Sequence, residues 1–141
     1  MTQNSLVGTW KLLSLEFRFE DGQAIYPFGK TPIGYLIYTE QGYISVNIMN
    51  ANRPPFSSED ITKLSKEEKA TAFETCVAYG GRYEIKDDKV IHHTEVSTIP
   101  NSVGIPQEHI FQLTDNRLSL STSPSEMENN SAIPMLIWER I

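Results

Sequence analysis

Two histidines, His92 and His109, are the side chains of this sequence best suited to move a proton. Imidazole titrates near neutral pH, so it can serve as a general acid or base under ordinary conditions. Two tyrosines, Tyr38 and Tyr83, fall on the same inward faces once strands are assigned as below. If the four groups share an interior, they could form a small acid–base set. Simple hydrogen bonding inside a half-polar core, or contact with a ligand, is the alternative.

A metal site has less support in the pattern. His92 and His93 are neighbours, and neighbouring side chains on a strand point to opposite faces, so they cannot share an ion. His93 and Glu95 share a face, but two ligands are fewer than the three or four that zinc requires. The sequence has no phosphate-binding loop, dinucleotide fingerprint, CxxC or GxSxG motif. We therefore expect no metal and no cofactor.

Charge and composition limit the kinds of partner that this protein can have. The 141 residues carry a formal net charge of -6, whereas a nucleic-acid-binding surface needs clustered Lys and Arg. No apolar run reaches the roughly 18 residues of a membrane span, and the N-terminal segment has no apolar signal-peptide core. The single cysteine, Cys76, excludes an internal disulfide and suits a reducing compartment. We expect one domain over 1–141, in the cytoplasm, with neither a nucleic-acid partner nor a membrane span.

An antiparallel sheet must hold the candidate residues in place. Residues 33–50 form the clearest hairpin, and Gly42 can adopt the positive φ that its three-residue loop needs. Pairing Thr39 with Tyr43 puts apolar side chains on one face: Leu36, Tyr38, Ile44, Val46 and Ile48. The opposite face is more polar. This asymmetry is typical of an antiparallel sheet that curls around a core.

Two further strand predictions follow from the same alternation. In the strand at 8–19 the apolar positions change parity between Leu12 and Leu13, which predicts a bulge. The strands at 82–86 and 89–98 form a hairpin in which Lys86 pairs with Lys89. Its inward face is then Tyr83, Ile85, Val90, His92, Thr94 and Val96.

The last strands lie at 109–113, 117–122 and 135–141. Pairing Thr114 with Arg117 aligns inward side chains on the first two: His109, Phe111, Leu113, Leu118 and Leu120. On the final strand, Trp138 and Arg140 share a face, so the guanidinium can stack on the indole and close one end of the structure.

Residues 51–80 differ in kind from the rest of the chain. Ser65 followed by Glu68 is a capping box, which predicts a helix that runs to about Tyr79. The side chains near one face of it are Ala70, Phe73, Cys76 and Val77. Because the rest of the chain is β, we predict that this insertion is a lid over one opening of the sheet structure.

The predicted fold is all-β: a roughly eight-stranded antiparallel up-and-down barrel with one helical insertion as lid. Consecutive hairpins without βαβ spacing favour this architecture, because a closed barrel leaves no strand edge exposed. Eight strands enclose room for one small ligand. The side chains we expect to line that space are Leu36, Val46, Ile48, Phe73, Thr94, Phe111, Leu120 and Trp138.

Gly8-Thr9-Trp10, at the start of the first strand, is similar to the G-x-W signature of lipocalins and fatty-acid-binding proteins. Together with YPFGKTPIGYLIYTEQGYISVNI, HHTEVSTIPNSVG and LIWERI, in this order, it resembles the bacterial and fungal lipocalin-like domain family. The resemblance spans nearly the whole chain. It implies a calycin-type β-barrel with a central cavity, but no single activity. In the strand after PNSVG it implies an arginine where this sequence has His109, so no anion-binding role is carried over.

Three functions stay open at this point. We favour binding of a small, mostly apolar molecule inside the barrel, in specialised metabolism. The alternative is a cofactor-independent cyclase, isomerase or lyase, in which His92 or His109 is the acid–base group and Tyr38 or Tyr83 assists. The third is an interaction module that forms a homodimer, which requires an exposed apolar patch.

Overall fold

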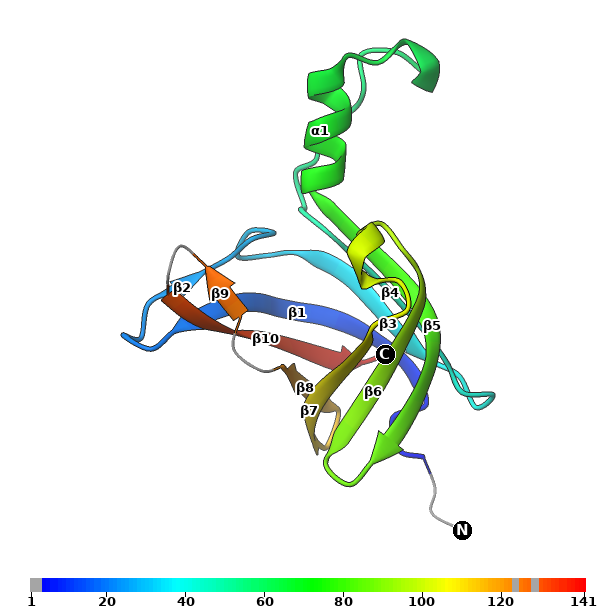
Figure 1. Cartoon of the computed structure of the whole chain (residues 1–141), viewed down its shortest axis with the longest axis vertical. Coiled ribbons are helices and arrows are strands. Elements are labelled where there is room, and N and C mark those ends of the chain that lie inside the picture. The colour runs from blue at the N-terminus through cyan, green and yellow to red at the C-terminus, as the bar shows by residue number, and fades with distance from the viewer. Residues whose placement is uncertain (1–3, 123–124, 128–129) are drawn as a thin grey trace.

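Antiparallel strands make up most of the computed structural model, which describes residues 4–122, 125–127 and 130–141 (Figure 1). One α-helix, α1 (Lys66–Glu74), and two 3-10 turns, Ile61–Lys63 and Pro100–Ser102, complete it. The strands are β1 (Gly8–Phe19), β2 (Ala24–Ile25), β3 (Ile33–Tyr38), β4 (Tyr43–Met49), β5 (Cys76–Lys86), β6 (Lys89–Ser97), β7 (Pro106–Thr114), β8 (Arg117–Ser121), β9 (Ser125–Met127) and β10 (Asn130–Arg140).

In the described part of the chain, eight strands close into a barrel. The order is β1-β3-β4-β5-β6-β7-β8-β10, and β10 pairs back with β1 along most of its length. The short strands β2 and β9 add to β1 and β10 outside the closed ring. Because every pairing is antiparallel, the predicted up-and-down barrel is confirmed. Closure satisfies the edges that an open sheet would leave unpaired.

The predicted hairpin registers are present in the structure. Tyr38 pairs with Ile44, Lys86 with Lys89, and Thr114 with Arg117. Period-2 alternation therefore places most of the apolar face of each hairpin inside the barrel, but Ile85, which was predicted to face inward, is 40% exposed. The buried apolar core includes Leu6, Trp10, Leu12, Leu15, Leu36, Tyr38, Ile44, Val46, Ile48, Tyr83, Val90, Leu118, Leu120 and Trp138.

Two bulges interrupt this alternation, and the sequence predicted one of them. The register of β1 shifts between Leu12 and Ser14, as the parity change indicated. The second bulge lies where β5 meets β6: Gly80 pairs with Val96 and Gly81 with Thr94, so Glu95 is the extra residue. Beyond it the parity of β6 is reversed, and Val96 is 68% exposed. The prediction that Val96 faces inward is therefore wrong.

The helix is shorter than predicted and does not cover the barrel. The Ser65–Glu68 capping box is present, but α1 ends at Glu74, because Cys76 already pairs with Met49 as the first residue of β5. The helix buries none of its side chains, and Phe73 is 52% exposed. In Figure 1, α1 projects beyond the ends of β4 and β5 instead of lying across a barrel opening, as the lid prediction required. No helix among the described residues is long and apolar enough to cross a membrane.

A cation–π contact closes the end of the barrel where β1 begins and β10 ends. The Arg140 guanidinium lies 4.2 Å from the centroid of the buried Trp10 ring, and the two residues are paired across β1 and β10. Arg140 also donates hydrogen bonds to the carbonyl oxygens of Val7 (2.9 Å) and Ser5 (2.6 Å), while Trp10 Nε1 donates to Leu6 O (3.0 Å). The predicted end cap therefore exists, but its aromatic partner is Trp10 instead of Trp138. With this end plugged, a ligand must enter from the other.

Candidate functional site

A cavity of about 520 Å³ lies at the barrel end opposite the Trp10–Arg140 cap. It is reached from the far end of β1 and the first residues of β10, and its size is within the usual range for small-molecule sites. Apolar side chains form most of its wall: Leu15, Phe17, Phe28, Ile48, Val77, Pro134 and Leu136. The polar lining residues are Tyr79, Gln107, Glu108, His109 and Thr122.

A hydrogen-bonded chain of three side chains runs from the core to this cavity. Tyr38 Oη lies 2.7 Å from His92 Nε2, and Tyr79 Oη lies 3.0 Å from His92 Nδ1. The three residues come from β3, β6 and β5, and inward alternation on each strand turns them toward one another. Although part of Tyr79 is exposed, its hydroxyl reaches His92, which is completely buried. Tyr79 therefore links the buried imidazole to the cavity wall.

Burial keeps all three groups of the chain uncharged at neutral pH. It lowers the pKa of His92 well below its usual value, and the neighbouring His109 and His93 lower it further. Burial also raises the pKa of Tyr38 and of Tyr79. A neutral imidazole has one N–H donor and one acceptor nitrogen, so one tyrosine donates to His92 and the other accepts from it.

The surroundings of Tyr38 favour one direction for these bonds. Its hydroxyl is buried, and among the described residues His92 is its hydrogen-bond partner. If Tyr38 accepted from His92, its own proton would be buried without an acceptor, which is costly. Tyr38 therefore donates to Nε2, and Nδ1–H donates to Tyr79. The Tyr79 hydroxyl hydrogen is then left to point to the cavity.

His109 is the most unusual group of the cavity. Its ring lies against that of His92, with centroids 4.4 Å apart, and it comes from β7, where it pairs with Val90 of β6. Only 5% of the residue is exposed, yet neither Nδ1 nor Nε2 has a hydrogen-bond partner among the residues that the structure describes. Burial lowers its pKa to about 4, so the ring is neutral at physiological pH. Asn50, Thr94 and Trp138 also have a buried polar atom without a partner among the described residues, but of these four residues only His109 lines the cavity.

Tyr83 lies outside the cavity and packs against Tyr38, the first residue of the hydrogen-bonded chain. Its ring meets that of Tyr38 edge-on, with centroids 4.7 Å apart. Its hydroxyl donates to Thr39 O (2.8 Å) and accepts from Asn4 Nδ2 (2.6 Å). These bonds occupy the hydroxyl, so Tyr83 positions Tyr38 and does not reach the cavity.

The structure thus brings together the four predicted acid–base residues, but only His109 lines the cavity. Of the side chains predicted to line it, Ile48 does so, and Phe73 lies on the exposed helix instead. The remaining six are inside the barrel, where they pack in or against the core: Leu36, Val46, Thr94, Phe111, Leu120 and Trp138.

Sequence reasoning missed Tyr79, the residue that connects the chain to the cavity. It was assigned to the end of a helix, although Val77, Tyr79 and Tyr83 follow a strand period of two. Phe28 was also missed, because it lies outside the regular strands, between β2 and β3.

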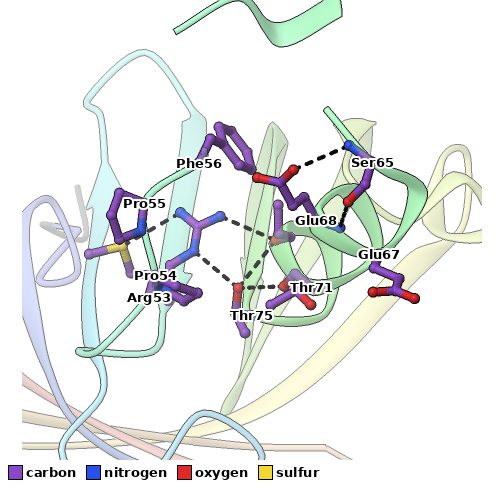
Figure 2. A pocket seen from close by; sticks show the side chains of 11 residues that line it. Arg53, Pro54, Pro55, Phe56, Ser65, Glu67, Glu68, Thr71 and Thr75 are labelled. Carbon is purple, nitrogen blue, oxygen red and sulfur yellow. Dashed lines mark hydrogen bonds between the residues drawn. The ribbon is translucent and has the colours of Figure 1, made fainter. Parts of the chain in front are cut away.

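A second cavity, of about 570 Å³, lies between the loop after β4 and α1 (Figure 2). Its main polar group is already engaged: Arg53 donates from Nε to Thr75 Oγ1 (3.1 Å) and from Nη2 to Ala72 O (3.2 Å). The Glu68 carboxylate accepts hydrogen bonds from the backbone N–H groups of Ser57 and Ser65. These bonds hold the insertion together. We therefore take the barrel cavity, where His109 is unpartnered, as the candidate site.

No group of three or more His, Cys, Asp or Glu residues in the described part of the chain could hold a metal ion. His92 and His93 point to opposite faces, as the sequence predicted. His92 is inside, whereas His93 is partly exposed on the outer face and lies 2.9 Å from Glu84 Oε1. The site therefore offers hydrogen-bonding groups in an apolar space.

Comparison with known proteins, like the geometry, indicates a barrel that binds a small molecule. A family model for a lipocalin-like domain matches residues 7–141. A curated protein of Aspergillus oryzae, the 4'-hydroxy-3'-methoxypropiophenone carrier protein ppsC, is 27% identical over 107 residues, which cover 70% of this chain and 96% of that protein. No solved structure matches significantly.

Proposed function

The chain belongs to the lipocalin-like domain family, and from that premise we propose that it binds a small, mostly apolar molecule in the barrel cavity and carries it unchanged. The observation that carries this proposal is His109, a buried and unpartnered side chain in the wall of an otherwise apolar cavity. A carrier needs apolar area for affinity and a few polar groups for orientation, and this cavity has both. The similarity to a protein named as a carrier supports the same function.

The ligand named for the fungal carrier is an aryl ketone with a phenolic hydroxyl and a methoxy group. Such a molecule has an apolar ring and three oxygen atoms, so it is a suitable first probe for this cavity. A second probe, N-phenyl-1-naphthylamine, is neutral and apolar, and its fluorescence increases when it leaves water.

Binding is tested by titrating the purified protein with N-phenyl-1-naphthylamine and by native mass spectrometry of the protein as isolated. We expect one dye molecule per barrel, displaced by any ligand that occupies the cavity. Leu136→Trp should weaken this binding, because Leu136 lines the cavity and the larger side chain occupies part of it. Ile133→Trp is the matched control, since Ile133 is on the same strand and 41% exposed. Equal dye binding by both variants would place the dye elsewhere and contradict the proposal.

A second candidate function is proton transfer on the bound molecule. The hydrogen-bonded chain from Tyr38 through His92 to Tyr79 ends at the cavity and could supply a proton there, while His109 could accept one. On an enolisable ketone, Tyr79 would donate to the carbonyl oxygen as His109 removed a proton from the α-carbon. Return of a proton to that carbon would complete an exchange or isomerisation without a cofactor.

The two functions predict different behaviour of the same ketone in deuterium oxide. A carrier leaves the rate of deuterium uptake at the α-carbon equal to that in buffer, as measured by NMR. Proton transfer predicts faster uptake that is lost in Tyr79→Phe, whereas the exposed Tyr43→Phe should retain it. Uptake at the buffer rate with saturated protein would exclude the catalytic function for this ketone.

A further inference from the structure

The polar end of the cavity provides hydrogen-bond donors and acceptors, but no positive charge. His109, in its neutral form, has one N–H donor and one acceptor nitrogen, and neither has a partner in the described part of the chain. Close to it, Tyr79 has a hydroxyl whose oxygen lies 3.0 Å from His92 Nδ1, which leaves its proton for the cavity. A hydroxyl or carbonyl oxygen of a ligand can satisfy these groups.

The charges around the cavity are unfavourable to an anion. Among the described residues that line it there is no lysine or arginine, and Glu108, which is exposed, contributes a negative charge. Lys89 forms an ion pair with Glu108, with 3.6 Å between Nζ and Oε2. The positive charge of Lys89 is therefore already paired with a carboxylate. A carboxylate inside the cavity would lose its hydration without gaining a cationic partner.

His109 does not supply the missing positive charge. Burial lowers its pKa to about 4, so the ring is almost entirely neutral at pH 6.5. His92, against which it packs, is held neutral for the same reason and is engaged by two tyrosines. An acidic ligand would have to bring a proton with it.

We infer that the ligand of this protein is a neutral molecule whose hydroxyl or carbonyl group hydrogen bonds to His109 and Tyr79, and that the cavity rejects carboxylates of the same shape. This inference rests on the proposed binding function and specifies the chemical class of its ligand. In this inference, His109 and Tyr79 determine which polar group the ligand must have. The apolar wall contributes affinity that does not depend on the polar group of the ligand.

The test compares three probes with one aromatic ring system: 4'-hydroxy-3'-methoxypropiophenone, methyl 4-hydroxy-3-methoxybenzoate and 4-hydroxy-3-methoxybenzoate. The first two are neutral and nearly equal in shape, and the third is a carboxylate. Each is used to displace N-phenyl-1-naphthylamine at pH 6.5, where the phenols are protonated and the acid is ionised. We expect the ketone and the ester to compete with similar affinity and the carboxylate to be at least tenfold weaker.

Variants assign the selectivity to His109. His109→Leu should lower the affinity for the ketone and the ester about tenfold, the usual effect of one lost hydrogen bond. His109→Gln, which keeps a donor and an acceptor, should restore much of the loss. His93→Leu is the control, because His93 is the neighbouring histidine on the outer face, beside Glu84.

The dye separates failure of this inference from failure of the proposed function. If N-phenyl-1-naphthylamine does not bind in the cavity, the binding function itself is wrong. The inference alone is overturned by any of three results with a dye-binding protein. These are equal competition by the carboxylate and the ester, failure of both neutral probes to compete, and unchanged ketone affinity in His109→Leu.

Discussion

The imidazoles of His92 and His109 lie with their centroids 4.4 Å apart, yet the two residues differ in every hydrogen bond they make. Both nitrogens of His92 contact tyrosine hydroxyls, whereas neither nitrogen of His109 has a partner within 4–122, 125–127 and 130–141. Both rings are buried and neutral, so the difference comes from position. His92, on β6, is inside the barrel and is bonded to Tyr38 of β3 and Tyr79 of β5. His109, on β7, lines the cavity. The first is therefore fixed by its two tyrosines, and the second is the group that we propose for contact with a ligand.

Tyr38→Phe should destabilise the protein by about 1 to 2 kcal/mol, because it removes a buried hydrogen bond and leaves His92 Nε2 without a partner. Urea denaturation gives the free energy of unfolding. Tyr35→Phe is the matched control: Tyr35 is on the same strand but 46% exposed, so its loss should be below about 0.5 kcal/mol. Equal losses in the two variants would show that the Tyr38–His92 bond contributes nothing to stability.

Gly81→Ala should be among the most destabilising substitutions in the sheet. A Cβ at this position would collide with the carbonyl oxygen of His93, because the bulge at Glu95 brings the two backbones together. We expect a loss of about 2 kcal/mol or more. Gly80→Ala is the graded comparison, since its Cβ would meet Ile44 O at 3.1 Å and needs a smaller shift. If Gly80→Ala proved the more costly of the two in urea denaturation, the close approach at Gly81 would be wrong.

The bulges in β1 and β6 show how much of the sheet could be predicted from the sequence. The bulge in β1 was visible because two apolar residues, Leu12 and Leu13, are adjacent and cannot both face inward. The bulge in β6 was not visible, because Thr94, Glu95 and Val96 keep a regular apolar–polar alternation. The signal that placed Val96 inside is the same one that correctly placed His92 there. Only the pairing with Gly80 and Gly81 distinguishes the two cases.

The site was harder to predict than the barrel. Alternation placed His92, His109, Tyr38 and Tyr83 inside, but it could not say which of them reach an open space. That depends on where the barrel is plugged, and the plug joins Trp10 to Arg140 from opposite ends of the chain. Tyr79 was missed because the capping box correctly starts a helix at Ser65, while nothing local marks its end at Glu74. Pairing with β4, a long-range interaction, ends it.

Ser65→Ala should loosen α1 without loosening the barrel. The Ser65 hydroxyl accepts a hydrogen bond from Glu68 N (3.1 Å), and loss of such a cap costs a helix about 1 kcal/mol. Because α1 buries no side chain, this loss should appear locally. We expect faster amide hydrogen exchange within 66–74 and unchanged exchange in β6 and β7. Faster exchange throughout the barrel would show that the helix contributes to global stability.

The protein should lose stability as the pH falls from about 6.5 toward 4, and His109 should account for part of this loss. In the unfolded chain His109 has the usual histidine pKa near 6.5, whereas in the native state burial lowers it to about 4. Between these values the unfolded state binds a proton that the native state does not, so the free energy of unfolding decreases as the pH decreases. The shift corresponds to a contribution on the order of 3 kcal/mol. His92, whose pKa is also lowered, adds to the same trend.

His109→Gln isolates this contribution, because glutamine has similar hydrogen-bonding groups and does not titrate. The other titratable groups beside His109 are His92, Tyr79 and Glu108, so the measured quantity is the difference between two curves of unfolding free energy against pH. We expect the curve of His109→Gln to be flatter than that of the wild type between pH 4 and 6.5. His93→Gln, which changes the outer histidine beside Glu84, is the comparison variant. If the two variants gave the same slope, His109 would titrate normally in the folded barrel, and a carboxylate ligand could then find a cation there.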